Sequence, residues 1–281
     1  MIKQLDSKLE KSLIIKSANV RLETIKLIHR VGAGHTGGDM SAADILIALY
    51  TYMNVNPETL KSKTRDYFIM SKGHSAEIYY KVLSEFGFFE SDRLETLGKI
   101  GSEFGGHPTK NIPGIEANTG SLGHGLGIGV GIAIGLKRDK LKNQVYVLTG
   151  DGELAEGSNW EAAMAANKFK LDNLTWIVDR NYLQISGKSE DVMPLEPLDK
   201  KMDSFGFGVH TIDGHNFQEI YDALNKPFDG KPKAIIAETI KGYGIREGEG
   251  VASWHHKVPS EEHVIQMEAD MKKIIEEVKN G

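Results

Sequence analysis

Hydrophobic residues along the chain follow two spacings, which predict alternating helices and strands. Between residues 8 and 29 apolar side chains recur at helical spacing with charged residues between them, which predicts an amphipathic helix. Short apolar runs typical of buried strands lie at 65–70, 145–149, 174–179, 209–212 and 234–238. Helical patterns lie at 42–52, 76–85, 118–138, 157–169 and 217–224, with a charged amphipathic helix at about 260–279.

This alternation predicts an α/β fold with a doubly wound, mainly parallel sheet and helices on both faces. The length of 281 residues suits a single domain over 1–281. Ser41 should cap the 42–52 helix. Glycines at 120, 123, 125, 127, 129, 131 and 135 interrupt the 118–138 pattern. Because each glycine in a helix costs about 1 kcal/mol relative to alanine, we expect close packing against a neighbour or a cofactor, with the helix starting near Ser121 and Leu122.

Composition narrows the class of protein. The net charge of −5 and the pI near 6.1 argue against a nucleic-acid partner, which would need a basic surface. The chain has no cysteine, so disulfides and zinc–thiolate sites are excluded. The first residues lack a signal-peptide core, and no apolar stretch is long enough to span a membrane. We therefore expect a soluble, cytoplasmic protein without a membrane partner.

The stretch from 145 to 187 carries the most informative chemistry. One apolar run ends at Gly-Asp-Gly (150–152) and the next ends before Asn181, with 28 residues between Gly152 and Asn181. Side chains that follow parallel strands face one crevice. Asp151, Asn181 and a backbone carbonyl such as that of Leu183 could therefore supply the oxygen ligands that Mg²⁺ takes beside a diphosphate. The alternative is that Gly-Asp-Gly and Asn181 only form turns.

Several histidines lie in glycine-flanked loops, where the backbone is free to bring a side chain to a ligand. His35, His74 and His107 occupy three such loops, and a glycine-rich connector after 240 carries His255 and His256. A single loop histidine usually has no special role, but three similar loops weaken that interpretation. A divalent-metal hydrolase could combine Asp151 with these histidines, although no local ligand pair such as H-x-x-x-H is present. Phosphate-loop and dinucleotide-binding patterns are absent.

Seven short blocks follow one another along most of the chain: GHTGGDMSAADIL, SKGHSAE, GGHPTK, TGSLGHG, GDGELAEG, DRNYLQISG and WHHKVPSEE. They resemble, in the same order, the blocks of the N-terminal, diphosphate-binding domain of transketolases. The resemblance implies the thiamine-diphosphate-binding fold and a transferase of carbohydrate metabolism, of the pentose phosphate type. Such an enzyme moves a two-carbon ketol unit from a ketose donor, here expected to be a sugar phosphate, to an aldose acceptor.

The resemblance also implies roles for individual residues. Three groups would hold Mg²⁺, or Ca²⁺ or Mn²⁺, on the cofactor's diphosphate: Asp151, Asn181 and the carbonyl of Leu183. Gly152, His74 and His255 would contact the cofactor's diphosphate, and Leu122 and Ile185 would pack on its rings. Gly120 is also assigned to the cofactor site. The residues that would face the donor sugar and move protons are His35, His107 and His255. Glu156 matches a carboxylate that lies at the subunit interface of the family, beside the cofactor site, and is linked there to the partner's catalytic glutamate.

The pyrimidine-binding domain that follows in transketolases, with its activating glutamate, has no counterpart in these residues. The resemblance thus implies a split enzyme whose second subunit supplies that half, in a heterotetramer with two copies of each chain. Two residues depart from the family: His124 stands where glutamine is common, and His256 where glycine is usual. The second departure leaves open whether His255 or His256 reaches the cofactor. Three alternatives stay open: a related enzyme acting on an unusual sugar, a deoxyxylulose-phosphate-synthase type, and a non-catalytic cofactor-binding or regulatory subunit.

Overall fold

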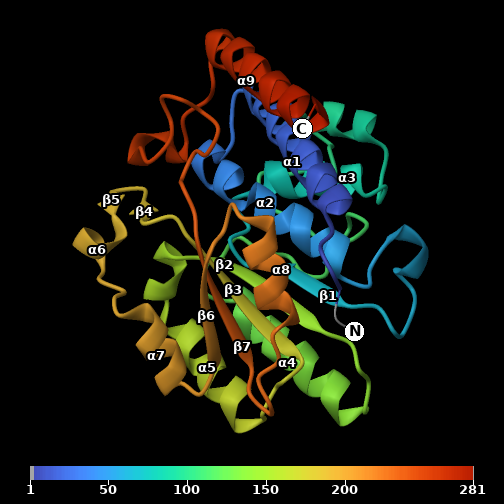
Figure 1. Cartoon of the computed structure of the whole chain (residues 1–281), viewed down its shortest axis with the longest axis vertical. Coiled ribbons are helices and arrows are strands. Elements are labelled where there is room, and N and C mark those ends of the chain that lie inside the picture. Colours follow the sequence, from blue (N-terminus) through green and yellow to red (C-terminus); the bar gives the residue numbers. More distant parts are fainter. Residues whose placement is uncertain (1–2, 281) are drawn as a thin grey trace.

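A five-stranded parallel sheet forms the centre of the computed structural model, which describes residues 3–280 (Figure 1). The strand order is β1-β2-β3-β7-β6. Their bounds are Tyr67–Met70 (β1), Val145–Gly150 (β2), Leu174–Arg180 (β3), Gly208–Asp213 (β6) and Lys233–Glu238 (β7). These are the strands predicted from the apolar runs, so the α/β fold with a mainly parallel sheet is confirmed. A short antiparallel pair, Leu183–Gln184 (β4) and Gly187–Lys188 (β5), was not predicted.

Alternate residues of the central strands face opposite sides of the sheet. In β2, Val145 and Val147 belong to one hydrophobic core, whereas Tyr146 and Leu148 belong to the other. Every residue of β2 and of β3 is buried. Because both faces are covered, these strands are apolar at consecutive positions instead of alternating with polar ones.

Helices cover both faces of the sheet, as the pattern predicts (Figure 1). One core contains residues of Ser7–Val31 (α1), Thr36–Tyr52 (α2), Ala76–Glu85 (α3) and Phe217–Asn225 (α8). The other contains residues of Gly125–Arg138 (α4), Gly157–Lys168 (α5) and Leu198–Ser204 (α7). The C-terminal helix Glu261–Asn280 (α9) lies along α1 and shares a third, smaller core with it. The predicted domain boundaries at residues 1 and 281 lie outside the described residues.

Helix α2 begins earlier than predicted. It starts at Thr36 with His35 at the N-cap, and Ser41 lies inside the helix instead of capping it. The Ser41 hydroxyl donates to the carboxylate of Asp179 at 2.6 Å. A Cβ at Gly38 would stand 2.9 Å from the Ser75 hydroxyl, so glycine is retained here by close packing against the loop after β1. Tertiary contact thus overrides the low helix propensity of glycine.

The glycine-rich helix begins later than predicted, at Gly125 and not near Ser121. Gly120 and Gly123 precede it with φ of 130° and 84°, a backbone region that interrupts a right-handed helix. The expected close packing is found at Gly129, where a Cβ would overlap the side chain of Val147 in β2. Gly127, Gly131 and Gly135 instead face open space. Within residues 3–280, no helix has the length and apolar character needed to cross a membrane.

Candidate functional site

A cavity of about 370 Å³ lies at the carboxyl ends of the strands. The predicted metal ligands Asp151, Asn181 and Leu183 line it. So do most of the other predicted site residues, namely His35, His74, His107, Gly120, Leu122, Gly152, Ile185 and His255. Glu156 is the predicted residue that is not part of the lining; it is exposed at the N-cap of α5. Residues spread over most of the chain therefore meet in one cavity.

The register of the sheet explains why Asp151 and Asn181 lie together. Gly150, the last residue of β2, is level with Asp179 of β3, and Arg180 is level with Glu238 of β7. The residues that follow these strand ends therefore emerge at the same edge of the sheet.

Asp151 is buried and its carboxylate is densely hydrogen-bonded. It accepts from the Arg180 guanidinium at 3.0 Å, the Tyr182 amide at 2.7 Å and the Ser189 hydroxyl at 3.1 Å. Its other oxygen accepts from the Gly152 amide at 2.7 Å. Burial, with the neighbouring Asp179, raises the pKa of Asp151, and Arg180 opposes that shift. These contacts fix the carboxylate at the cavity wall, as a metal ligand requires.

A fully buried ion pair lies beneath the cavity. The Lys72 ammonium contacts the carboxylate of Asp179 and donates to the Gly38 carbonyl at 2.8 Å. Burial alone would raise the pKa of Asp179, but Lys72 and the hydroxyl donors around it hold that pKa below its usual range. The pair ties α2, the loop after β1 and β3 together. Lys72 also lines the cavity and places a positive charge there.

Lys241 places a second positive charge at the cavity. It follows β7 closely, is buried, and donates to the Leu183 carbonyl at 3.1 Å. Burial, and the nearby positive charge of Lys72, lower the pKa of Lys241 to about 8. The carbonyl that was predicted as a metal ligand therefore already has a cation beside it. Two lysines in a cavity lined by few carboxylates favour an anionic ligand.

The histidines that line the cavity form a cluster. The ring of His35 lies 5.2 Å from that of His74, 6.0 Å from that of His107 and 5.6 Å from that of His255, measured between centroids. Burial, followed by neighbouring positive groups, lowers the pKa of His35 to about 4 and that of His255 to about 3. The pKa of His74 is lowered as well, for the same reasons. Neutral imidazoles can accept a proton at one nitrogen while donating from the other.

Several buried polar atoms of the cavity lining have no hydrogen-bond partner within residues 3–280. They are Nδ1 of His35, Nδ1 of His255 and Nε2 of Gln184. An unpaired buried polar group costs about 1–3 kcal/mol, so such groups indicate a place for a polar ligand. Glycine keeps the cavity open elsewhere: a Cβ at Gly152 would stand 2.9 Å from Gln184, and one at Gly120 would overlap the ring of His107.

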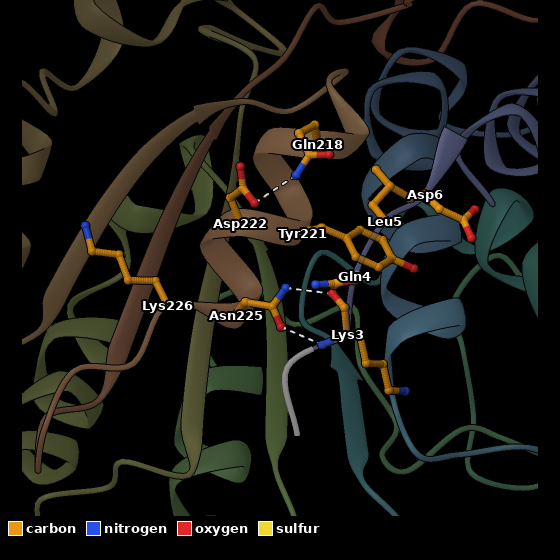
Figure 2. Close-up of a pocket in the computed structure, with 9 residues that line it drawn as sticks. All are labelled: Lys3, Gln4, Leu5, Asp6, Gln218, Tyr221, Asp222, Asn225 and Lys226. Atoms are coloured by element: carbon orange, nitrogen blue, oxygen red, sulfur yellow. Dashed lines mark hydrogen bonds between the residues drawn. The ribbon is translucent and has the colours of Figure 1, made fainter. Parts of the chain in front are cut away.

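A second hollow, of about 360 Å³, lies between residues 3–6 and α8 (Figure 2). Hydrogen bonds join its two sides, since the Lys3 amide donates to Asn225 at 3.0 Å and the Asn225 side chain donates to the Lys3 carbonyl at 2.8 Å. None of the predicted site residues lines it. We therefore place the functional site at the sheet edge.

The family model described as the thiamine diphosphate binding domain of transketolase matches residues 12–272. The chain belongs to the transketolase family. Among its relatives, one of the subunits of the apulose-4-phosphate transketolase of Phocaeicola vulgatus is 44% identical over 95% of this chain and 96% of that protein. The 6-deoxy-6-sulfo-D-fructose transketolase subunit of a Clostridium species is 38% identical over 86% of this chain and 90% of that protein. The resemblance inferred from the seven sequence blocks is confirmed.

Longer transketolases match over part of their length. Human transketolase is 39% identical over 85% of this chain but only 38% of that protein. The crystal structure of the Campylobacter jejuni transketolase superposes with a TM-score of 0.88 at 30% identity, covering 93% of this chain and 43% of that one. The chain thus spans less than half of these transketolases.

Four residues of this transketolase-family site are not among the site residues predicted from the sequence. Lys72 and Lys241 supply its positive charge, and Arg180 orients Asp151. Glu153 is buried and accepts from Ser71, from the Gly123 amide at 2.9 Å and from the Gly150 amide at 3.0 Å, so it joins the loop before α4 to the ends of two strands. A signal was available for the lysines, because each follows the end of a predicted strand within three residues.

Proposed function

We propose that the chain is the cofactor-anchoring subunit of a two-chain transketolase, which transfers a two-carbon ketol unit from an anionic ketose to an aldose. The observation that carries this proposal is the convergence of Asp151, Asn181 and Leu183 at one cavity that is also lined by a cluster of histidines. An oxygen-rich set and an imidazole-rich set suit two different tasks. The first suits a hard cation with a diphosphate, and the second suits proton movement.

The residues of the cavity fit thiamine diphosphate with Mg²⁺. Asp151, Asn181 and the Leu183 carbonyl would hold the metal, with Ca²⁺ or Mn²⁺ as replacements in the same oxygen set. Lys241 would move its ammonium from the Leu183 carbonyl toward the diphosphate, with His74 and the Gly152 amide beside it. Leu122 and Ile185 would border the cofactor's rings. When bound, thiamine diphosphate supplies the electron sink that carbon–carbon cleavage beside a carbonyl requires.

The histidines would act on the donor sugar. His35, His107 and His255 come from three separate segments of the chain and line one cavity, with the rings of His107 and His255 within 6.0 Å of that of His35. Neutral His35 and His255 could each accept a proton from a sugar hydroxyl and return it. The close approach of Gly120 to the ring of His107 limits the positions that this ring can take. The protein would thus orient the sugar, exclude water and move protons.

A second chain should complete the site. The outer face of α4 and α5 is uncovered, with Met164 58% and Ile128 37% exposed, and a Cβ at Gly127 or Gly131 would meet nothing within 4 Å. Ile185, at the rim of the cavity, is 62% exposed. A partner chain that carries the activating glutamate would cover these apolar surfaces, with Glu156 near the contact. We propose a heterotetramer with two copies of each chain, in keeping with relatives of similar length that are themselves named as transketolase subunits.

The donor class follows from the relatives' names combined with the charge of the cavity. One relative is named for a sugar phosphate, and another is named for a sulfonated ketose. We therefore propose that this enzyme takes an anionic ketose, with apulose 4-phosphate as the first compound to test.

Reconstitution tests the proposed function. The gene beside that of this chain is the first place to look for a chain with the pyrimidine-binding half. The purified chain alone should show no ketol transfer, whereas mixing it with that partner, thiamine diphosphate and Mg²⁺ should produce it. Transfer to a ribose 5-phosphate acceptor, followed by mass spectrometry, is the readout. Full activity of the chain alone would contradict the two-chain proposal.

A further inference from the structure

We propose that His35, His255 and His256 form a second metal site in the same cavity, which takes a transition metal such as Zn²⁺ and not Mg²⁺. The site is separate from the oxygen ligands at Asp151 and Asn181. Binding of the metal to the chain does not depend on the proposed function. Only the expected effect of the bound metal on ketol transfer rests on the proposed function.

The geometry is that of a three-nitrogen ligand set. One imidazole nitrogen from each of His35, His255 and His256 can be chosen so that the three atoms lie within 4.8 Å of one another. The ring centroids of His35 and His256 are 4.0 Å apart, and those of His255 and His256 are 4.8 Å apart. Nδ1 of His35 and Nδ1 of His255 are buried without a partner in the described part of the chain. Two of the three rings therefore have an unused nitrogen.

Hydrogen bonds join the two segments that carry these rings. The Thr36 hydroxyl donates to the Lys257 carbonyl at 2.8 Å, and the Gly242 amide donates to the Gly37 carbonyl at 2.9 Å. Trp254, just before the histidine pair, is 2% exposed in the small core. The start of α2 and the connector before α9 are thus joined on either side of the cluster. A preorganised ligand set binds a metal without paying a large ordering cost.

Imidazole nitrogens select the class of metal. Zn²⁺, Cu²⁺, Ni²⁺ and Co²⁺ accept imidazole ligands, whereas Mg²⁺ prefers oxygen. With bonds of about 2.0–2.1 Å in tetrahedral geometry, ligand nitrogens stand roughly 3.3 Å apart, so the rings need only small rotations. His256 is exposed and can make most of that adjustment.

A metal at this position would affect the enzyme in a specific way. It would occupy nitrogens of His35 and His255, the groups proposed to move protons on the donor sugar. Transition-metal ions should therefore inhibit ketol transfer reversibly and compete with the donor, while Mg²⁺ supports it. Mg²⁺ at the oxygen ligands would therefore support ketol transfer, whereas a transition metal at the three histidines would inhibit it.

Cobalt titration of the untagged chain tests this site without cofactor or partner. Tetrahedral Co²⁺ with nitrogen ligands has visible absorption bands that octahedral Co²⁺ in water lacks in comparable strength. We expect these bands to appear as Co²⁺ is added, to vanish when Zn²⁺ is added, and to persist in excess Mg²⁺. His256→Ala should weaken Co²⁺ binding at least about tenfold, because a ligand is removed.

Two controls keep the test decisive. His210→Ala removes a histidine on β6 outside the cavity and should leave the cobalt bands unchanged. His255→Ala should abolish them, and circular dichroism melting would show whether either cavity variant is folded. Unchanged cobalt binding in folded His256→Ala and His255→Ala would overturn the proposed site. Because the readout needs no thiamine diphosphate, that result would leave the proposed function standing.

Discussion

Replacing Asp151 with alanine is expected to weaken thiamine diphosphate binding to the assembled enzyme by about 10²- to 10³-fold, the effect of losing one partner from a desolvated charge contact. Asp151 is the only charged group among the three proposed metal ligands, so its loss leaves the cation with an amide and a carbonyl. Isothermal titration in the presence of Mg²⁺ measures the change. At 100 times its dissociation constant the cofactor should stabilise the wild-type fold by about 2.7 kcal/mol, and the variant should lose this gain.

The fold itself should survive this substitution. Arg180 would keep its contacts with Glu190 at 2.6 Å and with Glu196 at 2.9 Å, so its guanidinium would not be left unpaired. A loss of about 1–3 kcal/mol in the free energy of unfolding without cofactor is expected, since amide and hydroxyl donors lose their acceptor. Asp191→Asn is the matched control, because it removes a nearby exposed carboxylate that does not line the cavity. An unchanged dissociation constant for Asp151→Ala would exclude the proposed metal position.

Replacing His107 with asparagine is expected to lower kcat of the reconstituted enzyme by about 10²- to 10⁴-fold, the usual contribution of a general acid or base. Assembly and cofactor affinity should change little. The Tyr80 hydroxyl donates to the carbonyl of His107 at 3.0 Å, and this contact does not involve the side chain. The loop should therefore keep its course in the variant. Steady-state kinetics and size-exclusion chromatography are the two measurements.

The same variant distinguishes a catalytic subunit from a regulatory one. A non-catalytic, cofactor-binding subunit would tolerate His107→Asn with full turnover, which would contradict the roles proposed for the histidines. His210→Asn again serves as the control, because it alters a histidine on β6 that does not line the cavity. A loss of turnover in both variants would indicate a general effect on folding instead.

The sequence was sufficient for the sheet and for the residues at its edge. Asp151 and Asn181 were found because each directly follows an apolar strand, and strand ends in a parallel sheet share an edge. The start of α2 was missed because Gly37 and Gly38 discourage a helix locally. Their packing against Lys241, Trp254 and Ser75 is a tertiary effect that no local pattern contains.

The electrostatics of the site could not be read from the sequence for a similar reason. Arg180 is adjacent to Asn181 in the chain, yet its contact with Asp151 depends on the register between β2 and β3. The low pKa of His35 arises from burial and from neighbours such as His256, which is more than 200 positions away. The sequence leaves open whether His255 or His256 reaches the cofactor, and the fold places His256 against His35.

Magnetic resonance on Mn²⁺ tests most directly whether this sheet edge anchors the diphosphate of thiamine diphosphate through a divalent cation. Mn²⁺ would replace Mg²⁺ in the assembled enzyme, and electron–nuclear double resonance would detect phosphorus nuclei next to the metal. We predict phosphorus coupling when thiamine diphosphate is present, none with thiamine, and loss of the coupling in Asp151→Ala. Bound Mn²⁺ without phosphorus coupling, or a coupling that persists unchanged in Asp151→Ala, would contradict the proposed site.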